Sequence, residues 1–134
     1  TKILAKANNN ITANSLINKG LLHSSGNNTL KIGSITNNGN ILSVGNIVIS
    51  NNKNLTNSNK IQANGNINLN SKEIINSANL IAKNIDINNN NKLTNSNYII
   101  ATNTINLQEQ LLLKDIPLAK SIIKDEFNRK HYYK

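Results

Sequence analysis

The sequence predicts an all-β fold, a right-handed parallel β-helix built from coils of about 19 residues, and two observations lead to it. The first is an asparagine that returns in steps of 19, 20, 19 and 19 residues, at Asn18, Asn37, Asn57, Asn76 and Asn95. The second is an alternation of apolar and polar residues within each unit. A fixed period of this length is typical of stacked units that bury their apolar surfaces against one another.

The same aliphatic pattern frames every one of these asparagines. A large aliphatic residue stands two positions before, another stands four positions after, and a small residue stands six positions after. The residues before are Leu16, Ile35, Leu55, Ile74 and Leu93. The residues after are Leu22, Ile41, Ile61, Leu80 and Ile99, and the small ones are Ser24, Ser43, Ala63, Ala82 and Ala101. We expect these three rows to line the core, with the small residues where the coil is narrow.

Further apolar pairs such as Ile47 with Ile49 and Ile67 with Leu69 follow each small residue at a spacing of two. Period two is the signature of a strand, because successive side chains point to opposite faces. Each unit therefore offers about three short strands separated by corners rich in asparagine and glycine. The first unit fits worst, because Asn28 occupies an apolar position. Equivalent strands would lie parallel, and parallel crossovers are almost always right-handed.

The distribution of proline supports internal strands. Pro117 is the only proline, and none occurs within the repeats. This is expected where nearly every strand must donate hydrogen bonds to a neighbour. A horseshoe of strands and helices would need a helical or loop return with its own spacing, whereas the repeats display only period two.

The repeated asparagine has a physical role in such a coil. At the same corner of successive coils, each side-chain amide can donate to one neighbouring asparagine and accept from another. We therefore predict a structural ladder formed by the five asparagines, which would satisfy polar groups that water cannot reach.

The chain divides into a repeat segment, residues 1–107, with about five to six coils, and a non-repeat tail, residues 108–134. The tail predicts a short C-terminal α-helix over 116–130, because Asp115 is a good N-cap and Pro117 falls in the first turn. The apolar face of this helix would consist of Ile116, Ala119, Ile123 and Phe127. This helix would either cover the last coil or lead into another domain. Because the pattern begins in mid-unit, we expect a fragment of a longer protein.

Catalytic and metal-binding patterns are not found. The repeats contain only two acids, Glu73 and Asp86, and these stand at different positions relative to the repeated asparagine. His23 precedes Ser24, but neighbours on a strand point to opposite faces and so cannot act as base and nucleophile. Cysteine is absent. The sequence predicts no enzyme activity, no cofactor and no metal site.

The formal net charge is +9, which favours acidic partners such as glycans, nucleic acid or bacterial surfaces, or simply keeps a rod soluble. Lys53, Lys72 and Lys92 precede successive asparagines by four, four and three residues. They predict a basic edge that either binds polyanions or discourages sideways pairing of sheets. No apolar run reaches the roughly 18 residues of a membrane-spanning helix, so we expect no membrane insertion. We also expect no specific nucleic-acid partner.

The repeat itself, Asn-x-(Gly/Asn/Ala)-x-(Ile/Leu)-x-(Ser/Ala), occurs for example in residues 37–43 and 57–63. This Asn-rich repeat resembles the repeats of filamentous haemagglutinin and related large exoproteins. The resemblance covers about residues 1–107. The resemblance implies two-partner secretion through an outer-membrane pore to the Gram-negative cell surface. It also implies a long β-helical shaft that is used either in adhesion, and so in virulence, or in contact-dependent growth inhibition.

The functional expectation is therefore a structural shaft segment of a large secreted bacterial surface adhesin or haemagglutinin. Such a shaft would present a distal binding or toxin region, whose partner would be a host-cell glycan or a bacterial surface receptor. The alternative is a direct glycan- or polyanion-binding module that uses the basic edge. Binding of the isolated chain to a polyanion would distinguish the two.

Overall fold

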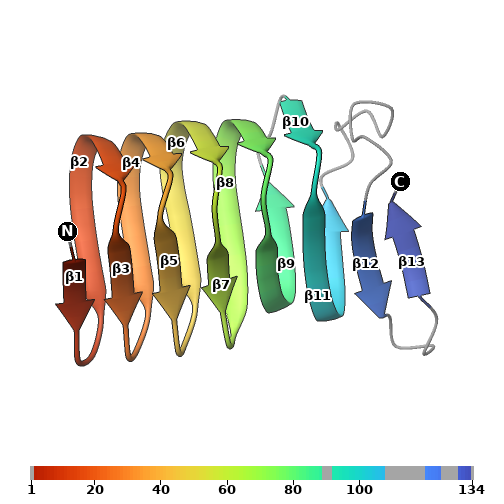
Figure 1. The fold of residues 1–134 in the computed structure, drawn as a ribbon, viewed down its shortest axis with the longest axis horizontal. Helices are drawn as coiled ribbons and strands as arrows, with labels where there is room; N and C mark the ends of the chain where they lie inside the picture. Colours follow the sequence, from red (N-terminus) through yellow and green to blue (C-terminus); the bar gives the residue numbers. More distant parts are fainter. Residues whose placement is uncertain (1, 89–91, 108–119, 125–129, 134) are drawn as a thin grey trace.

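The computed structural model describes residues 2–88, 92–107, 120–124 and 130–133. These residues form an all-β solenoid of about five turns in which parallel strands of successive coils stack along one axis (Figure 1). Four short strands alternate with four long strands along the first part of the chain. The short ones are β1 (Lys2–Ala5), β3 (Leu21–Ser24), β5 (Asn40–Ser43) and β7 (Ile61–Ala63). The long ones are β2 (Asn9–Asn18), β4 (Asn28–Asn37), β6 (Ile47–Asn57) and β8 (Asn66–Asn76).

The remaining strands are β9 (Leu80–Asn88), β10 (Lys92–Asn95), β11 (Tyr98–Leu107), β12 (Lys120–Lys124) and β13 (Lys130–Tyr133). Strand pairing divides the coil into three faces. The first face contains the short strands β1, β3, β5 and β7, the beginnings of β9 and β11, and β12. The second face contains the first halves of the long strands and the ends of β9 and β11. The third face contains the second halves of the long strands and β10.

The pairing register follows the sequence period. Ile35 pairs with Leu55, Leu55 with Ile74, and Ile74 with Leu93. On the first face, Leu22 pairs with Ile41 and Ile41 with Ile61. The predicted alignment of the repeats is therefore confirmed, and with it the parallel β-solenoid of coils of about 19 residues. The right-handed sense of the coil stays a prediction.

The core is a continuous column of aliphatic side chains inside the three faces. The predicted rows are buried: Ile41, Ile61 and Leu80 are 0% exposed, and Ala63 and Ala82 are 3% exposed. Leu16, in β2 at one end of the described stack, is only partly buried against this core. Since every coil adds the same few aliphatics, the core extends lengthwise and each coil is stabilised by its neighbours.

Asn28, the misfit of the first unit, has a partner one coil away. Its side-chain oxygen accepts a hydrogen bond from the Asn9 amide at 2.8 Å, and its own amide donates to the Leu42 carbonyl at 3.0 Å. Asn28 is fully buried. In the next coil the same position is Ile47. A buried polar residue is accommodated here because it has hydrogen-bond partners, as burial of an amide requires.

The C-terminal helix predicted over 116–130 is wrong for the residues that the structure describes. Lys120–Lys124 forms β12, which pairs in parallel with Tyr98–Ala101, and Lys130 begins β13, which pairs antiparallel with β12. The remaining residues of the predicted helix, 116–119 and 125–129, lie outside the described residues. Residues 120–124 form a strand because their backbone N–H and C=O groups pair with those along an edge of β11. Without β12 this strand edge would be left unpaired, which is unfavourable. β-Branched Ile122 and Ile123 also suit a strand.

Candidate functional site: the asparagine ladder and the surface of the coils

The five repeated asparagines form one continuous hydrogen-bonded ladder. The Nδ2 of each donates to the Oδ1 of the next, from Asn18 to Asn37 at 2.8 Å and from Asn37 to Asn57 at 2.9 Å. The chain continues from Asn57 to Asn76 and from Asn76 to Asn95, both at 2.8 Å. Asn18 is 9% exposed and the other four are fully buried. The amides therefore provide hydrogen bonds where water does not reach.

The backbone places these side chains. Each asparagine is the last residue of its strand, at the corner between the third and first faces. Backbone hydrogen bonds join the corners of successive coils in register, for example from Ser58 N to Asn37 O at 2.8 Å and from Ser77 N to Asn57 O at 2.9 Å. The side-chain amides also donate to carbonyls of the following coil, as Asn37 does to Lys60 at 3.1 Å. Each of the first four asparagines thus links its own coil to the next coil through both side chain and backbone.

A second asparagine row, at the corner between the first and second faces, was missed by sequence reasoning. Here the side chain accepts from the backbone of the next coil: Asn8 Oδ1 from Asn27 N at 2.8 Å, and Asn27 Oδ1 from Asn46 N at 2.7 Å. The row continues from Asn46 Oδ1 to Asn66 N at 2.8 Å. The available signal was a Gly-Asn pair that recurs at the coil period, at residues 26–27, 45–46 and 65–66.

At Gly45 and Gly65 of this second corner, the neighbouring coil approaches too closely for a side chain, whereas the next coil has Lys83 at the corresponding position. A Cβ added to Gly45 would collide with Asn27 Oδ1 and would lie 2.9 Å from Gly26 O. Gly65 has the same relation to Asn46 Oδ1 and Gly45 O. The repeated geometry of the row therefore leaves no space for a side chain at Gly45 or Gly65, the residues that precede Asn46 and Asn66.

Replacing Gly45 with alanine should destabilise the fold by about 1–3 kcal/mol, because the added methyl group must displace backbone of the preceding coil. Urea unfolding measured by circular dichroism would report the change. Val44→Ala, at an adjacent position that is 50% exposed, is the matched control and should stay close to the parent. Equal stability of the Gly45 variant and the control would contradict the close packing at this corner.

The predicted basic edge is only partly formed. Lys53, Lys72 and Lys92 are all exposed. Asn54 of β6 pairs with Glu73 of β8. Lys53 and Lys72 each stand one residue earlier, so these two lysines occupy equivalent positions in neighbouring coils. Lys92, however, pairs with Glu73 itself and lies one position further along the third face. The structure therefore brings two of the three lysines together in one row and places the third beside a carboxylate.

The residues considered for catalysis are kept apart. His23 is half-buried on β3, whereas Ser24 is fully buried, and its Oγ contacts the Ala7 carbonyl and donates to the Asn27 carbonyl at 3.0 Å. Glu73 lies on the third face and Asp86 on the second. Asp86 accepts a hydrogen bond from Asn106 at 2.7 Å. Among the described residues, no three His, Cys, Asp or Glu side chains lie close enough to hold a metal ion.

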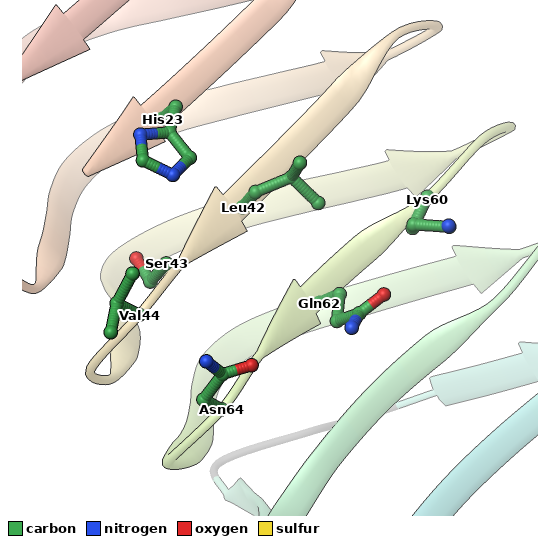
Figure 2. A pocket seen from close by; sticks show the side chains of 7 residues that line it. All are labelled: His23, Leu42, Ser43, Val44, Lys60, Gln62 and Asn64. Carbon is green, nitrogen blue, oxygen red and sulfur yellow. The ribbon is translucent and has the colours of Figure 1, made fainter. Parts of the chain in front are cut away.

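The first face carries a shallow hollow of about 200 Å³ that spans three strands. His23 of β3, Leu42 of β5 and Gln62 of β7 lie side by side across it (Figure 2). Val44, Lys60 and Asn64 complete the outer lining. The side chains thus combine apolar surface with amide and cationic groups, and they come from three consecutive coils.

Comparison of the chain with protein-family models, curated proteins and solved structures finds no match. In the part of the chain that the structure describes, there is no helix of the length and apolar character that crossing a bilayer demands. The described residues therefore have to be interpreted from their own geometry. Most of the contacts described above are hydrogen bonds that repeat from coil to coil.

Proposed function

We propose that this chain is a shaft segment of a large secreted bacterial surface adhesin or haemagglutinin, which holds a distal binding or toxin region away from the cell. The observation that carries the proposal is the uninterrupted asparagine ladder from Asn18 to Asn95, together with the aliphatic column beside it. The first four ladder asparagines each use a buried side-chain amide to bind the following coil. Such a stack extends along one axis and suits a rigid spacer.

The bacterial surface setting rests on the resemblance of the repeats to those of filamentous haemagglutinin-type exoproteins. In this proposal the parent protein crosses the outer membrane through a partner pore and folds into a rod outside the cell. The described coils then contribute length and stiffness. The specific contact with the host glycan or with a receptor of the neighbouring bacterium is made by the distal region.

A spacer should tolerate the loss of one whole coil. Deleting residues 38–57 joins Asn37 to Ser58 and reproduces the natural Asn57–Ser58 junction. Because Asn37 and Asn57 pair in register, the ladder would reform between Asn37 and Asn76. We expect the full-length protein with this deletion to reach the cell surface and keep its adhesion, as measured by antibody labelling and cell binding.

The matched control removes only residues 38–47, which is about half a coil and shifts every following strand out of register. This shorter deletion should abolish folding and display. Loss of adhesion with normal surface display after the whole-coil deletion would contradict a spacer role.

The alternative, a polyanion-binding module, predicts that the isolated chain binds heparin at physiological salt. Substituting Lys53→Gln together with Lys72→Gln would remove the two lysines that share one row. If the chain binds heparin and this double variant does not, the shaft proposal fails as a complete account of these coils. We expect no heparin binding that survives physiological salt, because exposed charges are screened strongly there.

A further inference from the structure

The outer surface of the first face has a row of side chains running along the stack, four of them aliphatic and two polar. One outward position per strand is in register from β1 to β11: Leu4 pairs with His23, His23 with Leu42, and Leu42 with Gln62. Gln62 pairs in turn with Ile81, and Ile81 with Ile100. The row thus consists of Leu4, His23, Leu42, Gln62, Ile81 and Ile100. Leu4 is 63% exposed and the other members are partly exposed.

Lysines lie along both margins of this row. Lys2 and Lys60 precede their strands' row members by two residues, and exposed Lys19 lies at the adjoining corner. At the opposite corner, Lys6 directly follows β1, and Lys83 lies within β9, where this strand passes from the first face to the second; both lysines are exposed. The two acids in the described coils, Glu73 and Asp86, lie on the third and second faces. The described part of the first face therefore combines an apolar centre with positive margins.

The face is also suitably shaped for a flat partner. Six of its strands, from β1 to β11, pair in parallel, so the row members form one continuous array with about 4.8 Å between neighbours. The hollow around Leu42, bordered by Lys60 and His23, lies within this array (Figure 2). A cation beside an exposed aliphatic side chain matches an anionic headgroup beside the first carbons of an acyl chain.

We infer that the first face docks peripherally on an anionic lipid surface, with Leu4, Leu42, Ile81 and Ile100 at the headgroup boundary and the marginal lysines on the headgroups. Apolar side chains framed by lysines are the composition that holds proteins at such interfaces. A wholly polar polyanion would leave the aliphatic members of the row unused. A second copy of the same face would meet like charge across the contact. Contact of this kind requires no membrane insertion.

The test measures co-sedimentation of the chain with vesicles of phosphatidylcholine alone and with mixed vesicles of phosphatidylglycerol and phosphatidylcholine. We expect binding to the mixed vesicles only. Leu42→Ser with Ile81→Ser should abolish most of this binding. Lys2→Gln with Lys60→Gln should weaken it by about fivefold for each lysine removed.

Two control variants carry the same chemical changes on other surfaces. Ile17→Ser with Ile75→Ser alters two exposed aliphatics of the third face, and Lys53→Gln with Lys72→Gln alters two exposed lysines of the same face. Both should bind like the parent, and circular dichroism should show that all variants fold. Equal weakening by the two lysine pairs, absence of vesicle binding, or binding to poly-glutamate but not to vesicles would each overturn the inference. None of these outcomes alters the heparin or coil-deletion tests of the shaft.

Discussion

Replacing Ile61 with aspartate is expected to produce the largest loss of stability, several kcal/mol in the free energy of unfolding. Ile61 is fully buried in β7, between Ile41 of the coil before and Leu80 of the coil after. A carboxylate at this position would be removed from water with no cation beside it, and the aliphatic contacts to both neighbouring coils would be lost. Thermal and urea unfolding followed by circular dichroism would measure the effect.

Gln62→Asp is the matched control, because Gln62 is the next residue of the same strand and lies on the outer surface of the first face. It introduces the same carboxylate in contact with water and should change stability by only a few tenths of a kcal/mol. If Ile61→Asp and Gln62→Asp unfold at the same urea concentration, the assignment of inward and outward positions is wrong.

The second large effect is expected for Asn57→Ala, at the centre of the ladder. Its loss leaves the Asn37 amide without its acceptor and the Asn76 carbonyl oxygen without its donor, both in a fully buried row. Each polar group left unsatisfied costs about 1–3 kcal/mol. Urea melts should therefore show a marked fall in the unfolding midpoint.

Asn54→Ala provides the comparison within the same strand, because Asn54 is exposed on the third face. It should tolerate the change almost completely. Indistinguishable melts for Asn57→Ala and Asn54→Ala would mean that the ladder contributes nothing to stability, although its hydrogen bonds are present.

Features that repeat at the coil period could be predicted from the sequence. Ile41, Ile61 and Leu80 fall at one position of the unit and are all buried in one row of the core. The ladder from Asn18 to Asn95 follows from the same period, because an amide can both donate and accept along a stack. Here each local signal is repeated several times, so one misfit such as Asn28 does not obscure it.

Features that occur only once along the chain and depend on pairing with a neighbouring coil could not be predicted from the repeat. The tail has helical spacing at Ile116, Ala119 and Ile123, yet Lys120–Lys124 is a strand because an edge of β11 offers it backbone partners. Local propensity is weaker than such tertiary pairing. Lys92 was placed with Lys53 and Lys72 by counting back from the asparagines, but strand pairing sets it opposite Glu73. A difference of one residue in spacing decides that outcome.

The register between coils underlies both the core and the ladder, and engineered disulfides can measure it because the chain has no cysteine. Thr36 and Thr56 pair across neighbouring strands of the third face. Registered strands lie about 4.8 Å apart, within the Cα separation that a disulfide spans. Thr36→Cys with Thr56→Cys should therefore cross-link rapidly under mild oxidation, whereas Thr36→Cys with Asn54→Cys, offset to about 8 Å, should not. Equal rates for the two pairs, or faster closure of the offset pair, would contradict the stacked-coil register.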